Sequence, residues 1–279
     1  MAFKLFDYQS SGSGVSKTAP QKKPFFRYWE IFGRKFWKII ELNLLYVLFC
    51  IPVVTFGPAT AALTHVMRKF ILEQPCFVFD EFFTAFKKNF KQSVAIGIID
   101  VVGVAALVVA LFEFMATDKL PEGMIVYICV FICLATLLYI MHFYIYLEIV
   151  ALKLPLKAML KNALLLVFLG VKRNFIALVI NLVIITLSVL FLPYSIFVII
   201  VFPLAFMSFT TTFICYPVIQ KYIINPYYEE RGERNPELGP ISEEDIAENA
   251  VFVDKISLSR SRLRQDIYNA HPYQRGLRN

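Results

Sequence analysis

The chain has 279 residues, of which 58% are hydrophobic, 16% aromatic and only 18% charged. Soluble domains are about 45–50% apolar and about 25% charged, so a soluble core of this length could not bury so much apolar surface. The composition excludes an ordinary soluble protein and predicts an all-α membrane protein. The net charge of +7 does not require nucleic acid as a partner, because its distribution along the chain fits membrane topology.

Residues 1–24 are polar and contain no apolar stretch of the kind that a cleaved signal peptide needs. We interpret them as a flexible cytoplasmic N-terminus, so the first membrane helix is expected to direct insertion. Residues 25–222 form the predicted membrane domain. Residues 223–279 are polar again and are predicted to be a cytoplasmic tail, either disordered or ordered by a partner.

Six apolar stretches are predicted to cross the membrane, since a crossing needs about 20 largely apolar residues. Four of them are long and nearly free of charge. The first is shorter, and the second is rich in small residues and could cross, re-enter or lie at the surface. The predicted crossings are residues 39–55, 57–70, 93–117, 124–147, 175–192 and 194–219.

Basic residues decide between five and six crossings, because short cytoplasmic loops collect Lys and Arg. If residues 57–70 cross, every basic residue except Lys119 falls on one side; without that crossing, the basic clusters alternate between the two sides. We therefore predict six transmembrane helices arranged as three hairpins, with both termini in the cytoplasm. The predicted location is the cell membrane.

An amphipathic segment ending in a basic cluster precedes each predicted hairpin, within residues 25–36, 77–90 and 156–175. The second segment carries phenylalanines at helical spacing, followed by an Asn-Phe pair: Phe79, Phe82, Phe83, Phe86, Asn89 and Phe90. This spacing predicts a helix that lies in the membrane interface with its apolar face toward lipid. The threefold pattern is either an internal repeat or a convergent feature of membrane sequences.

Asp100 is the ionisable residue placed deepest in a predicted crossing. Intramembrane charges are rare and often functional, so Asp100 is a candidate for transport, although a structural hydrogen bond between helices is the favoured interpretation. No charged partner is apparent at helical spacing. Glu41, Glu113 and Glu148 stand near predicted helix ends and are expected to reach water.

The five cysteines and three histidines show no spacing typical of a disulfide framework, a metal site or a nucleophilic site. We therefore predict no enzymatic activity, no catalytic residue, no metal and no cofactor.

The most informative segment connects the first two predicted crossings. Its residues of interest are Asn43, Pro52, Thr55, Gly57, Pro58, Ala59 and Leu63. Pro52 removes a helical hydrogen bond, Gly57-Pro58 predicts a tight break, and the alanines that follow permit a close helix approach. Two interpretations stay open: a hairpin corner, or a packing surface or gate.

At these residues the sequence resembles the YesL family of bacterial integral membrane proteins. A second match is Lys88-Asn89-Phe90-Lys91-Gln92, and the resemblance extends over about residues 25–222. Members are typically encoded near carbohydrate ABC importers in Gram-positive bacteria. The resemblance implies a non-enzymatic accessory subunit or modulator of such an importer, with permease subunits and membrane lipid as partners. The alternative is a stand-alone small-solute transporter or channel that uses Asp100.

Overall fold

The computed structural model describes residues 23–116, 124–152, 154–232, 235 and 237. The predicted flexible N-terminus and nearly all of the predicted tail lie outside the described residues. The chain divides into two compact units, Met1–Pro226 and Tyr227–Asn279. All regular secondary structure in the described residues is helical, which confirms the all-α prediction.

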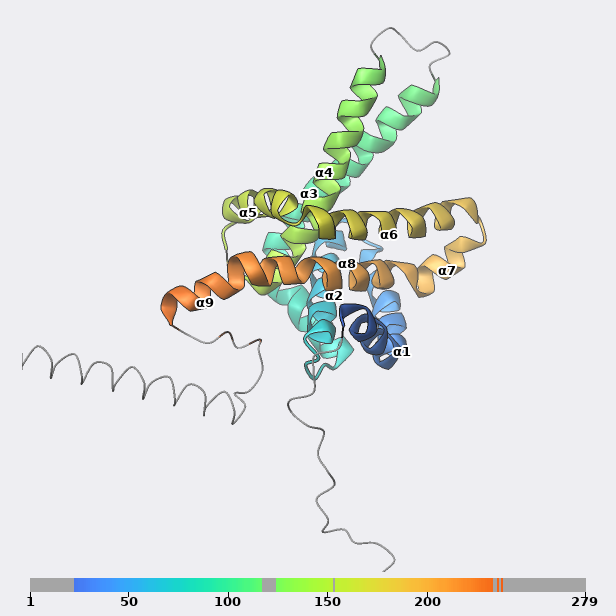
Figure 1. Cartoon of the computed structure of the whole chain (residues 1–279). Helices are drawn as coiled ribbons and strands as arrows, with labels where there is room; N and C mark the ends of the chain where they lie inside the picture. Colours follow the sequence, from blue (N-terminus) through green and yellow to red (C-terminus); the bar gives the residue numbers. More distant parts are fainter. Residues whose placement is uncertain (1–22, 117–123, 153, 233–234, 236, 238–279) are drawn as a thin grey trace, which may run out of the picture. The chain divides into compact units, whose positions relative to one another are not determined.

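The first four helices and one short 3-10 turn (η1) occupy the N-terminal half of the chain (Figure 1). Their bounds are α1 Pro24–Cys50, η1 Val53–Thr55, α2 Phe56–Ile71, α3 Val78–Ala116 and α4 Met124–Ala151. The remaining elements are α5 Leu156–Leu169, α6 Val171–Leu190, α7 Ser195–Val201, α8 Pro203–Ile219, the π-helical turn η2 Gln220–Ile224 and α9 Asn225–Arg231.

Within the described residues, three helices are long and apolar enough to cross a membrane, namely α3, α4 and α6. The pair α7–α8, bent by 54° at Pro203, could form a fourth crossing. The helix α2 has only 16 residues, which is short of the about 20 that a crossing needs. By length and composition, the chain therefore has the helices of a multi-pass membrane protein.

Two of the three predicted interfacial helices are not separate elements. Residues 25–36 belong to α1, and residues 77–90 fall almost entirely in α3, which continues unbroken into the predicted crossing. No proline or glycine interrupts α3 between Val78 and Gln92, so nothing ends the helix there. The third predicted segment does form its own helix, α5, which ends at Gly170.

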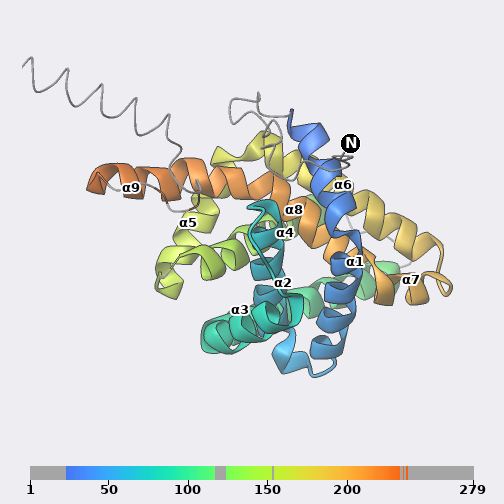
Figure 2. The same ribbon diagram turned by 90° about the horizontal axis from the view of Figure 1, so that it is seen from below.

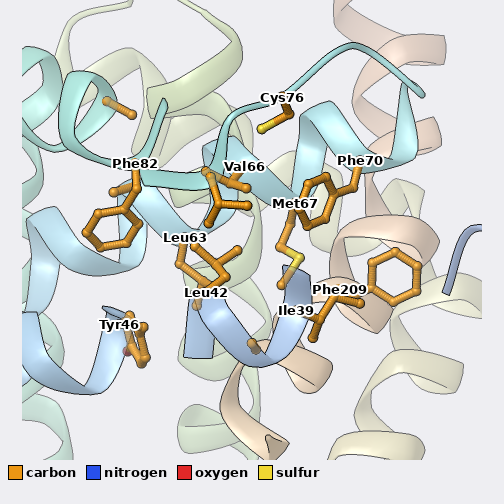
Figure 3. Packing of buried hydrophobic residues seen from close by; sticks show 14 of the residues in the cluster. Ile39, Leu42, Tyr46, Leu63, Val66, Met67, Phe70, Cys76, Phe82 and Phe209 are labelled. Atoms are coloured by element: carbon orange, nitrogen blue, oxygen red, sulfur yellow. The ribbon is translucent and has the colours of Figure 1, made fainter. Parts of the chain in front are cut away.

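The core of the first unit surrounds α2, which contacts α1, α3, α4 and α8. Figure 2 shows α2 between α1 and α3. Every residue of α2 from Gly57 to Thr64 is buried, including Ala59 and Leu63 of the motif. Figure 3 shows how the helices interdigitate through Ile39, Leu42, Leu63, Val66, Met67, Phe70, Phe82 and Phe209.

The outer parts of α3 and α4 have few neighbours. They extend beyond the other helices of the first unit (Figure 1), and their apolar side chains are largely exposed. In the most apolar stretch of each helix, only 17% of α3 and 6% of α4 is buried within the chain. The apolar side chains of this outer hairpin, residues 101–110 and 125–138, are therefore left largely uncovered by the described part of the chain, and they suit lipid or another protein as surroundings.

Candidate functional site

Asn43 joins α1 to the bend between α7 and α8. Its side chain is fully buried, and its amide nitrogen donates to the carbonyls of Ile200 at 2.7 Å and Ile199 at 3.1 Å. Its amide oxygen accepts from the backbone N–H of Ala205 at 2.7 Å. Because Pro203 has no N–H, the carbonyl of Ile199 loses its helical partner. Asn43 therefore satisfies backbone groups that the bend leaves free.

Thr55 closes the corner between α1 and α2. Its hydroxyl lies 2.6 Å from the carbonyl oxygens of both Phe49 and Pro52, and its single hydrogen is shared between them. Its backbone N–H also bonds to the Pro52 carbonyl at 3.0 Å. The last carbonyls of a helix have no partner within the helix, and Thr55 supplies one for α1. The corner is thus held by its own residues.

Gly57 and Pro58 lie in the first turn of α2, so the predicted break falls a few residues earlier, after Cys50. A proline is tolerated there because the first N–H groups of a helix lack partners anyway. A Cβ on Gly57 would overlap the carbonyl oxygen of Ser93, and a Cβ on Gly97 would lie 2.7 Å from the Gly57 Cα. The crossing of α2 and α3 therefore requires glycine at both positions, as a packing surface does.

The phenylalanine face of α3 packs on α1 at its centre. Phe82 is fully buried, and the ring of Phe49 lies 5.4 Å from that of Phe82 and 5.1 Å from that of Phe86. The prediction that this whole face meets lipid is wrong, because α1 and α3 both pack on α2 and so contact each other. The other members of the face are exposed or half-buried: Phe79, Phe83, Asn89 and Phe90.

Asp100 has two partners on α4. The Tyr146 hydroxyl donates to its Oδ2 at 2.8 Å, and His142 Nδ1 lies 3.0 Å from the same oxygen. His142 and Tyr146 are four residues apart and therefore share one helix face. The sequence suggested that Asp100 has no partner on its own helix. Its partners come instead from the neighbouring helix, α4. An i, i+4 pair of polar side chains in the next crossing was the signal available.

Glu148 of α4 is fully buried, and neither of its carboxyl oxygens has a hydrogen-bond partner within the described part of the chain. The expectation that it reaches water from a helix end is wrong. The helices α2, α3, α5 and α8 all pack on α4, which the sequence does not indicate. By contrast, Glu41 and Glu113 are exposed, as expected.

A second buried polar cluster, which sequence reasoning missed, fastens the α5–α6 corner to α4. The Tyr144 hydroxyl donates to Asn174 Oδ1 at 2.5 Å, and Asn174 Nδ2 donates to the Val167 carbonyl at 2.9 Å. A Cβ on Gly170 would meet both the Tyr144 hydroxyl and the Asn174 amide. Glycine at this corner therefore lets the two polar side chains approach.

Basic side chains of α1 hold the loop between α2 and α3. Arg34 forms an ion pair with Glu73 at 2.5 Å, Arg27 lies 3.5 Å from the same carboxylate, and Lys38 donates to the Cys76 carbonyl at 3.1 Å. Burial raises the pKa of the Cys76 thiol. Part of the basic cluster from which the cytoplasmic side was predicted thus also fixes the open end of the α1–α2 hairpin.

A family model described as "Protein of unknown function, DUF624" matches residues 39–111. The match covers about a quarter of the chain and contains α2, Asp100 and every motif residue from Asn43 to Leu63. No curated protein and no solved structure matches the chain. Among the described residues, no group of three or more His, Cys, Asp or Glu side chains could hold a metal ion.

Proposed function

We propose that this chain is a non-enzymatic accessory subunit or modulator of a carbohydrate ABC importer in the cell membrane of a Gram-positive bacterium. The resemblance to the YesL family, carried by the motif from Asn43 to Leu63, supports the importer as partner. The family match over residues 39–111 includes that motif.

The outer hairpin of α3 and α4 is the observation that carries the proposal. Its side chains are apolar and exposed on most sides, among them Val102 at 62% and Val130 at 61%. A Cβ on Gly103 would meet nothing within 4 Å, and Ala106 is exposed one turn later. Small residues let transmembrane helices approach closely, so this surface suits the helices of a permease.

For this role we propose that both termini are cytoplasmic. The support is the distribution of basic residues, with Lys119 alone expected on the outer side. The six crossings predicted from the sequence require α1 and α2 each to cross. An α1–α2 pair that enters and leaves on one side gives four crossings and leaves both termini in the same compartment.

Co-purification tests the proposal. The tagged chain, extracted in mild detergent, is expected to bring an importer permease and its ATPase in stoichiometric amounts, identified by mass spectrometry. Ala106→Trp on α3 should remove the permease, whereas Val183→Trp, at an exposed position of α6, should not. Recovery of the wild-type chain without a permease would overturn the proposal. Recovery of the permease with both variants would place the contact outside the outer hairpin.

The second candidate is a stand-alone transporter or channel for a small solute, which the contacts of Asp100 with His142 and Tyr146 favour. Intramembrane carboxylates with titratable neighbours are common in proton and ion pathways. Asp100→Asn should then abolish solute flux in proteoliposomes while the chain stays monodisperse. Unchanged flux would exclude Asp100 from the mechanism.

A further inference from the structure

We propose that α1 and α2 form a re-entrant hairpin that enters the bilayer from the cytoplasmic side, turns inside the hydrocarbon and returns to the same side. Its tip, residues 51–54, would contact lipid acyl chains. This inference goes beyond the proposed function and rests only on its placement of both termini in the cytoplasm, which the controls at Lys88 and Lys119 test separately.

The length of the hairpin is the first argument. Its open end is fixed by the Arg34–Glu73 ion pair and by the bond from Lys38 to the Cys76 carbonyl. From Arg34 to Cys50, α1 rises about 24 Å, at about 1.5 Å per residue. The 16 residues of α2 also span about 24 Å. The hydrocarbon core is about 30 Å thick, so a hairpin whose ion pairs lie at the headgroups does not reach the far side.

Glu41 limits the depth further. It is exposed on α1, three residues beyond Lys38. An exposed carboxylate facing acyl chains is costly, so Glu41 must lie within reach of the headgroups. The tip at Ile51 is about 15 Å farther along the helix, which is about half of the hydrocarbon thickness.

The chemistry of the tip is the second argument. Ile51 is 73% exposed, Val53 63% and Val54 62%, and Pro52 between them is exposed as well. Turns are usually rich in Gly, Pro, Asn, Asp and Ser, and residues 51–54 contain only Pro52 of these. Four consecutive exposed apolar residues at a turn fit acyl chains as their surroundings.

The backbone of the tip is the third argument. Backbone polar groups in the hydrocarbon need partners within the protein, because no water is present there to bond them. Pro52 has no N–H, and its carbonyl accepts from the N–H and the hydroxyl of Thr55. The same hydroxyl serves the Phe49 carbonyl at the end of α1. The motif residues Pro52 and Thr55 thereby acquire a common role, which is to reduce the number of unpaired backbone groups at the turn.

Spin labelling at single cysteines tests the inference. Cys50, Cys129 and Cys133 are replaced by alanine, whereas the buried Cys76 and Cys215 stay. Val54→Cys carries the label, Lys88→Cys on the basic side is one control, and Lys119→Cys is the control on the opposite side. In lipid vesicles, the label at Val54 is expected to collide with dissolved oxygen and to be shielded from a water-soluble nickel chelate.

Labelling of intact cells with a membrane-impermeant maleimide completes the test. Val54→Cys and Lys88→Cys should show no external labelling, whereas Lys119→Cys should be labelled. External labelling of Val54→Cys, or access of the nickel chelate there, would overturn the re-entrant hairpin in favour of two crossings. Shielding from both oxygen and chelate would overturn the contact with lipid, since the tip would then be covered by protein. Val53→Cys, equally exposed, replaces Val54→Cys if that variant is not monodisperse.

Discussion

Both ends of α3 carry many apolar side chains, but these side chains have different surroundings. In the inner part, up to Gly97, Phe82, Ala85 and Ile96 are buried against the rest of the first unit. In the outer part, Val102, Val104 and Val109 are more than half exposed. In a membrane protein, hydropathy therefore identifies residues that avoid water and does not identify their neighbours.

The difference between the two parts lies in small and polar residues. Lipid tails are as apolar as leucine, so helices associate in a membrane through close packing and hydrogen bonds. The inner part has both, in the contact of Gly57 with Gly97 and in Glu81, whose carboxylate lies 3.2 Å from His65 Nε2 on α2. In the outer part, Gly103 has no such neighbour within the described residues.

The largest contrast is expected between Phe82→Ala and Phe79→Ala, one turn apart on α3. Phe82 is fully buried, and its truncation leaves a cavity that should cost about 3–5 kcal/mol of stability. Phe79 is 57% exposed, so its truncation should change stability by less than about 1 kcal/mol. Thermal unfolding in detergent measures both, and equal shifts would contradict the described burial.

Gly97→Leu should be the next most damaging change, with Gly103→Leu on the same helix as its control. A side chain at Gly97 meets the backbone of Gly57, which cannot rotate away, so a loss of about 3 kcal/mol is expected. A side chain at Gly103 meets open space and should leave stability unchanged. A tolerated Gly97→Leu, measured by the same unfolding assay, would exclude the close crossing of α2 and α3.

Asn43→Leu leaves the backbone groups at the α7–α8 bend without their partner. The expected loss is about 2 kcal/mol, since an unsatisfied buried polar group costs about 1–3 kcal/mol. Asn43→Asp keeps the acceptor for Ala205 and loses both donated bonds. Leu44→Ala, at an exposed neighbouring position, is the control and should have little effect. If the two Asn43 variants matched this control, the bend would not depend on Asn43.

The smallest effect concerns Cys76. Because burial raises the pKa of its thiol, the reactive thiolate is scarce near neutral pH, and alkylation of the folded chain should be slow. The rate should increase as the pH rises toward the thiol pKa. A mass shift after maleimide treatment measures it, with Lys88→Cys as the exposed control. Labelling of Cys76 as fast as that control would contradict its burial.

Sequence reasoning predicted where apolar helices lie better than it predicted their contacts. The starts of α4 and α5 agree with the predicted segments, whereas α1 and α3 each continue through a segment predicted to be a separate interfacial helix. Periodicity also indicated that one face of α3 is apolar, but not that Phe49 covers it. For Asp100, a search along its own helix could not find His142 and Tyr146, because those partners are 42 and 46 residues away in the chain.

By itself, the sequence determined that the chain is helical and belongs in a membrane, because these properties follow from composition and from helical periodicity. Only the tertiary structure decided which apolar faces are buried, that Glu148 is enclosed, and that Asn43 serves a bend about 160 residues away in the chain. The physical reason is that apolar residues gain little by exchanging lipid for protein. Whether an apolar face meets lipid or protein therefore depends on close packing and hydrogen bonds, which form only when distant helices meet.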